Sequence, residues 1–161
     1  MEDFQAAIEG AKKRIKIADH ILDSTFPLVK DPRLLMGVME NTFLALSNAM
    51  SSLLYYERFF KRIDNFKDDF KDKFYIFRYE ILNKYRLSRD YLILIQDVKN
   101  MVSDHKNSPI EFSKGDRFVI CSEGYMCRSV SVDDMKKFIS KSKQFIQDVS
   151  SIVYKNERIF R

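Results

Sequence analysis

The sequence contains little of what an all-β protein or a membrane protein needs. Its 161 residues include four Gly, three Pro and no Trp. A fold of many short strands depends on Gly and Pro for its turns, so this composition favours helices. No apolar run approaches the roughly 20 residues of a membrane-spanning helix, and residues 1–10 lack the charged-then-apolar pattern of a secretion signal. We therefore expect a cytoplasmic protein that does not cross a membrane.

Cysteine and histidine are also scarce, which narrows the possible chemistry. Cys121 and Cys127 are too few to form a zinc site and lack the C-x-x-C spacing of a redox motif. Their separation fits two strands of one hairpin, on which they would face each other. Because cytoplasmic thiols normally stay reduced, we expect a free pair and keep a disulfide as the alternative. The sequence predicts no metal site and no cofactor.

Apolar residues recur at three- and four-residue spacings, which is typical of amphipathic helices. They predict a mainly α fold, an antiparallel bundle of about five helices, near residues 3–22, 31–63, 65–81, 88–107 and from 131 onward. The expected start signals are Asp31 with Pro32, Asp64 or Asn65, Ser88, and Ser131. Pro27 should end the first helix, because the residue before a proline is pushed out of the helical region.

Residues 110–131 differ from the rest of the chain in their spacing. Short apolar runs separated by Gly-containing turns predict a small β-hairpin or three-strand flap, inserted before the last helix. No internal repeat or linker interrupts the sequence, so we expect one domain over residues 1–161. The second helix has a wide apolar surface, which indicates a central element with neighbours on more than one side.

A polar stripe follows this second helix. Asn41, Asn48 and Tyr55 repeat every seven residues, and Glu40 lies beside them. A buried polar group without a partner costs about 1–3 kcal/mol, so the stripe should meet polar groups on another helix or another subunit. We favour internal hydrogen bonds that set the helix register over a ligand site.

The net charge of +5 permits a nucleic-acid partner without demanding one. The cationic residues of interest are Lys12, Lys13, Arg14 and Lys16 near the N-terminus, and Lys136, Lys137, Lys141 and Lys143 on the last helix. Lysines opposite an apolar row often form only a solvated face, as we also expect for the charged run 67–73. If the first and last helices are neighbours, the clusters would instead merge into one strip along a phosphate backbone. Arg117 and Arg128 on the flap, with Tyr125 to stack a base, would extend that strip.

Catalytic residues are harder to find. Arg14 and His20 have a spacing similar to a nuclease signature, but six residues along a helix separate them by about 120°, so they should not converge on one phosphate. His105 follows at the end of the fourth helix, where the helix dipole favours a protonated imidazole and a capping role. We therefore expect no catalytic site, with Arg14 and His20 as the weak candidates.

The second helix reads Glu40-Asn41-Thr42-Phe43-Leu44-Ala45-Leu46-Ser47-Asn48-Ala49, polar and then rich in alanine. With two long helices at its start, the chain resembles the HEPN superfamily over about residues 1–106. Members are small helical bundles that often dimerise, and some cleave RNA. The catalytic Arg and His of the family lie late in the bundle, where this chain has Arg86 or Arg89 and His105 at too wide a spacing.

This resemblance implies a non-catalytic relative, a homodimer that binds RNA or a ribonucleoprotein through its basic helical faces. Two alternatives remain at this point. One is a structural or adaptor bundle that docks a protein partner, and the other is a metal-independent ribonuclease that uses Arg14 and His20.

Overall fold

The computed structural model describes residues 1–108, 110–115, 117–121, 124 and 126–155. Its helices are α1 (Asp3–His20), α2 (Phe26–Val29), α3 (Leu34–Phe59), α4 (Phe70–Ile76), α5 (Asp90–Asn107) and α6 (Val132–Val153), with π-helical segments η1 (Ile21–Thr25) and η2 (Phe77–Ile81). Strands β1 (Ile110–Lys114), β2 (Arg117–Cys121) and β3 (Cys127–Val130) precede α6. Because η1 joins α1 to α2 and η2 extends α4, the predicted bundle of five helices with a small sheet before the last helix is confirmed.

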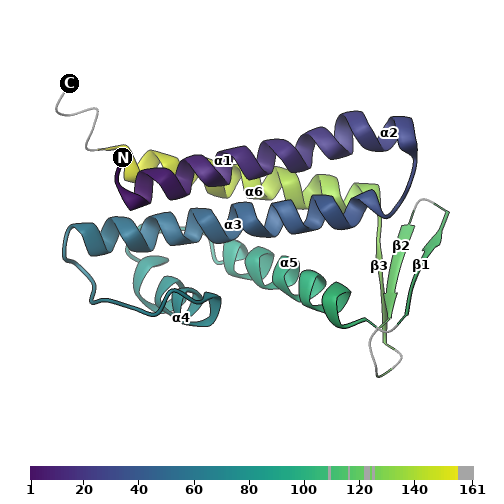
Figure 1. Cartoon of the computed structure of the whole chain (residues 1–161). Coiled ribbons are helices and arrows are strands. Elements are labelled where there is room, and N and C mark those ends of the chain that lie inside the picture. The colour runs from purple at the N-terminus through teal and green to yellow at the C-terminus, as the bar shows by residue number, and fades with distance from the viewer. Residues whose placement is uncertain (109, 116, 122–123, 125, 156–161) are drawn as a thin grey trace.

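Helix α3 is the centre of the bundle (Figure 1), and it packs against α1, α4, α5 and α6. Leu35, Leu46 and Leu53 along its length have no exposed surface. Most of the wide apolar surface predicted for this helix is therefore covered by neighbours from the same chain, whereas Leu44 and Phe59 stay exposed. None of the helices within the described residues is long and apolar enough to cross a membrane.

The first helix does not end before Pro27, as we expected. It continues through η1 and α2 as far as Val29, and Phe26 keeps a helical backbone with φ −59° and ψ −45°. The Phe26 amide donates to the carbonyl of Ile21, five residues back, so the hydrogen bonding is already shifted where proline lacks its donor. The chain reverses only after Lys30, whose φ is +56°.

The start signal predicted for the third helix was also wrong. Helix α3 ends at Phe59, and α4 begins at Phe70, where the Asp69 carboxylate accepts a hydrogen bond from the Asp72 amide at 2.9 Å. Neither Asp64 nor Asn65 caps a helix, because residues 60–69 form a non-helical connection of turns and bends. The signal predicted for the last helix is confirmed, because the hydroxyl of Ser131 caps α6 and accepts a hydrogen bond from the Asp134 amide.

The sheet has the strand order β1-β2-β3, with both pairs antiparallel. Cys121 on β2 lies opposite Cys127 on β3, and a disulfide joins them. The two cysteines thus face each other across a hairpin as predicted, but the expectation of a free pair was wrong. The sheet contacts the helices through Phe118 and Ile120 of β2, which are buried in the core.

Candidate functional site

The lysine clusters predicted as a nucleic-acid interface lie on two neighbouring antiparallel helices, α1 and α6 (Figure 1). Contacts at both ends fix this arrangement. The Tyr154 hydroxyl donates to Glu9 at 2.8 Å, and the Lys143 ammonium pairs with Asp19. Lys12 forms an ion pair with Glu9 at 3.2 Å and lies 5.2 Å from the centre of the Tyr154 ring. Lys12 and Lys143 are therefore engaged in the contact between the helices.

The other lysines of these helices are exposed, and the described part of the chain holds no ion pair for any of them. They are Lys13, Lys16, Lys136, Lys137 and Lys141. Lys137 and Lys141 are one helical turn apart, so they share an edge of α6. Lys136 shares a shallow hollow with Asp19 and Asp23 of the first helical segment. The two clusters are thus adjacent, but these carboxylates interrupt the strip between them.

The arginines of the flap are held by neighbouring groups. Arg117 is exposed and donates to the Ser129 hydroxyl at 3.2 Å, across the β2–β3 pair. Arg128 forms an ion pair with Asp104 of α5 at 3.5 Å. Both cations lie on the sheet at the end of the bundle where α6 begins (Figure 1). Tyr125, predicted to stack a base, lies outside the described residues.

The polar stripe of α3 meets partners within the same chain. The side-chain oxygen of Asn41 accepts a hydrogen bond from Arg14 of α1 at 3.3 Å, and its nitrogen donates to the Gly37 carbonyl at 2.8 Å. Further along, α1 approaches α3 closely at Gly10, where an added Cβ would lie 3.2 Å from the Asn48 amide nitrogen. The stripe therefore faces α1 in this region, which agrees with a role in helix register.

Arg14 and His20 do not form a pair. Arg14 is bound to Asn41, as described above, whereas His20 is exposed at the end of α1 and has no hydrogen bond among the described residues. In the described part of the chain, no hydrogen bond or ion pair brings a nucleophile, a base or a second cation to either side chain. The structure therefore does not place these two residues in one site.

His105, expected as a helix cap, instead joins three elements. Its Nδ1 lies 2.8 Å from Glu111 on β1, and its Nε2 lies 3.7 Å from Glu40 at the polar stripe of α3. The imidazole thereby links the last turn of α5 to the sheet and to the central helix. Among the described residues, no group of His, Cys, Asp and Glu side chains forms a metal site.

Tyr55, the last member of the stripe, belongs to a polar cluster that the sequence did not predict. Lys73, assigned to the solvated run 67–73, is buried and donates to the Tyr55 and Ser51 hydroxyls, each at 3.1 Å. It also pairs with Asp68, which accepts a hydrogen bond from Tyr55 at 2.8 Å. The signal for this burial was present, because Lys73 lies three residues after Phe70 and four before Phe77, on the apolar face.

A lysine beside a serine can activate it as a nucleophile only if the amine is neutral. Burial would lower the pKa of Lys73, but the hydrogen bonds to Asp68 and Tyr55 outweigh burial and raise this pKa. Lys73 therefore stays protonated and cannot accept a proton from Ser51. The cluster connects α3 to α4 and the preceding connection, and its geometry is that of a structural contact.

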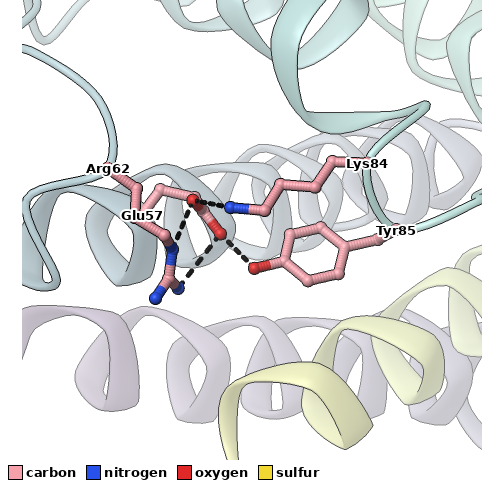
Figure 2. A network of polar contacts seen from close by, with 4 residues as sticks. All are labelled: Glu57, Arg62, Lys84 and Tyr85. Carbon is pink, nitrogen blue, oxygen red and sulfur yellow. Dashed lines mark hydrogen bonds and ion pairs between the residues drawn. The ribbon is translucent and has the colours of Figure 1, made fainter.

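A second cluster surrounds Glu57, near the C-terminal end of α3 (Figure 2). The carboxylate is only 1% exposed and lies among three donors. Arg62 donates from Nε at 2.8 Å and from Nη2 at 3.2 Å, Lys84 donates at 2.6 Å, and the Tyr85 hydroxyl completes the set. Glu57 thereby ties α3 to the connection between η2 and α5.

Burial would raise the pKa of Glu57, but the hydrogen bonds from Arg62, Lys84 and Tyr85 outweigh it and lower this pKa. The carboxylate is thus ionised, and its oxygens are occupied by groups of the chain. Such a saturated site has no open position for a substrate, so we assign it a structural role. No sequence pattern singles out Glu57, because Lys84 and Tyr85 lie far from it along the chain.

Comparison with known protein families, with curated proteins and with solved structures found no match to this chain. The HEPN resemblance stays a prediction that rests on the residues quoted for it.

Proposed function

We propose that the chain is a non-catalytic, HEPN-like helical protein that binds RNA or a ribonucleoprotein through α1 and α6. One observation carries the proposal: Lys13, Lys16, Lys136, Lys137 and Lys141 are exposed on neighbouring helices, and the described residues offer them no ion pair. An ammonium group without a carboxylate partner is free to neutralise a phosphate. Each such contact releases a counterion, which is the main source of non-specific affinity for a nucleic acid.

The absence of a catalytic role is part of this proposal. Arg14 is bound to Asn41, His20 stands apart from it, and His105 is placed between two glutamates. These contacts argue against the ribonuclease alternative. In an RNA-cleavage assay His20→Ala should leave the background signal unchanged, and a loss of cleavage with folding intact would revive that alternative.

We further propose that the protein acts as a homodimer in the cytoplasm, where the Cys121–Cys127 disulfide would have to persist in a reducing environment. The polar stripe does not supply the dimer contact, because Asn41 and Tyr55 already have partners in their own chain. A second subunit would have to use another face. A different protein partner could use such a face as well, so the adaptor alternative stays open. Recovery of one stoichiometric protein in a nuclease-treated pull-down would favour that alternative.

The binding proposal is tested by removing cations from the two helices. Lys13→Ala, Lys16→Ala and Lys136→Ala combined should weaken binding to single-stranded RNA at least tenfold in a filter-binding titration at low salt. Lys67, Lys71 and Lys106, which are exposed elsewhere on the molecule, provide a matched control with the same loss of charge. Equal weakening in both triple variants would show that net charge alone drives binding and would overturn the assignment to α1 and α6.

A further inference from the structure

A shallow groove runs between α5 and the helical segment formed by α4 and η2. Its volume is about 430 Å³, and it is lined by Phe74, Arg78, Arg89, Leu92, Ile93, Gln96 and Asp97. Its floor is apolar, and cations and a carboxylate stand along it. Tyr75 and Tyr79, which follow the lining residues Phe74 and Arg78 in the sequence, are 64% and 58% exposed, with their ring centres 4.7 Å apart. The surface is therefore wider and more apolar than the groove alone.

Three lining residues along α5 are evenly spaced, with opposite charges at equal distances on either side of a central isoleucine. Arg89, Ile93 and Asp97 follow one another at four-residue intervals, so they lie on one face of the helix. Ile93 in the middle is 60% exposed. Arg89 and Asp97 have no ion-pair partner in the described chain, and eight residues of helix hold them about 12 Å apart. They are too distant to pair with each other.

We propose that this groove is the contact surface for a second copy of the same chain. If two α5 helices cross in antiparallel fashion at Ile93, a two-fold axis passes close to that residue. Residues 89 and 97 are equidistant from it along the sequence, so Arg89 of each copy meets Asp97 of the other. The two exposed isoleucines then pack together, and two ion pairs close the ends of the contact. A two-fold interface requires this kind of self-complementary patch.

Charge argues for this occupant over others. A nucleic acid would meet the carboxylate of Asp97, and a peptide of one charge sign would leave either Asp97 or the arginines Arg78 and Arg89 unpaired. A second copy offers an arginine to Asp97 and an aspartate to Arg89, while Arg78 already stacks on Tyr79, 5.2 Å from the ring centre. Helices α1 and α6, which carry the proposed RNA-binding lysines, lie across α3 from α4 and most of α5 (Figure 1). Dimerisation through α5 would thus leave those lysines accessible.

This inference rests on the homodimer of the proposed function, but not on RNA binding, so it is tested without RNA. Sedimentation velocity over a range of protein concentrations should show a dimer of the wild-type chain. Arg89→Asp should weaken it at least tenfold, because residue 89 then faces Asp97 of the other copy. Asp97→Arg should do the same by opposing two arginines. Both residues are exposed, and aspartate is favourable at the start of a helix, so both variants should fold.

The decisive sample is an equimolar mixture of the two variants. Each charge reversal should be monomeric alone, and the mixture should form a heterodimer, because each aspartate then meets an arginine. A wild-type chain that stays monomeric would overturn the dimer while leaving RNA binding untouched. A wild-type dimer that neither variant weakens, or variants that do not recombine, would overturn the assignment to α5.

A cross-link gives an independent readout of the geometry. Ile93→Cys places one thiol close to the proposed axis, so mild oxidation should give a covalent dimer. Lys141→Cys, exposed on α6, is the matched control and should stay monomeric. Equal cross-linking of the two variants would contradict the proposal.

Discussion

Glu57 and Lys73 are buried side chains, and burial alone would disfavour the charged form of each. In both, hydrogen bonds from neighbouring groups outweigh that effect, so the pKa of Glu57 is lowered and the pKa of Lys73 is raised. Each charge also has partners that are distant along the chain, namely Lys84 and Tyr85 for Glu57, and Ser51 and Tyr55 for Lys73. These contacts fix how α3 meets the connections on either side of α4, so both clusters should be visible in the free energy of unfolding.

Glu57→Gln keeps the shape of the side chain but removes its charge. We expect the free energy of unfolding to fall by about 1–3 kcal/mol, because a buried charge-assisted hydrogen-bond network is broken. Urea unfolding at neutral pH measures this loss. Glu80→Gln, an exposed glutamate on η2, is the control and should leave the midpoint unchanged.

The same pair of proteins has a predicted pH dependence. The folded pKa of Glu57 lies below its ordinary value of 4.5, so its contribution is fully present above that value. It is lost as the pH falls through the lower, folded value. The wild-type chain should therefore lose more stability than Glu57→Gln between neutral pH and acid. Parallel acid curves for the two proteins would contradict the account of this network.

Lys73→Met tests the second cluster, because methionine retains most of the apolar stem. The Ser51 hydroxyl would lose its donor in a buried position, and we expect a loss of about 1 kcal/mol in unfolding free energy. Adding Ser51→Ala should recover part of that loss, since no buried polar group is then left unpaired. Additive losses in urea unfolding of the two single variants and the double variant would count against this explanation.

At the scale of elements, side chains that cap the first turn determine where a helix begins. The Ser131 hydroxyl and the Asp134 carboxylate form a reciprocal capping box at the start of α6. Ser131→Ala should lower the unfolding free energy by about 1 kcal/mol, because one amide of the first turn loses its acceptor. Thermal unfolding measures the effect. Ser140→Ala, exposed within α6, is the control and should not destabilise the protein, because alanine favours helix.

The disulfide joins β2 to β3 and closes a short loop between residues six positions apart. Loop-closure entropy predicts a stabilisation of about 2 kcal/mol. The double variant Cys121→Ser, Cys127→Ser should lose this amount under oxidising conditions, and a reductant should bring the wild-type chain to the same value. A wild-type chain that does not respond to reductant would contradict a stabilising role for the bridge.

The elements that sequence predicted best are those whose ends depend on local contacts. Ser88 and Ser131 precede α5 and α6 as expected, and the flap follows from its turn residues. The predictions were wrong where the structure depends on contacts that the local sequence pattern does not show. The passage of the first helix through Pro27 depends on a shifted hydrogen bond, and the burial of Lys73 depends on hydroxyls of α3. The Glu57 network is likewise invisible in sequence, because Lys84 joins it from another part of the chain.

At the scale of the whole molecule, α1 and α6 lie on the other side of α3 from α4 in Figure 1, and α5 contacts α6 near its own start through Tyr91 and Asp148. Exposed lysines without ion-pair partners among the described residues lie on α1 and α6, and the self-complementary groove lies along α5. A dimer formed through α5 would present two sets of lysines to one polyanion. Such a pair should bind a long RNA more tightly than a short one, because the second contact becomes intramolecular.

The salt dependence of RNA affinity tests the central claim most directly. If the five exposed lysines each neutralise one phosphate of single-stranded RNA, the logarithm of the association constant should fall with the logarithm of salt concentration with a slope of about −3.5 per subunit. The variant without Lys13, Lys16 and Lys136 should show a slope of about −1.4. A chain that does not bind RNA at low salt, or whose affinity does not change with salt, would contradict the proposed function.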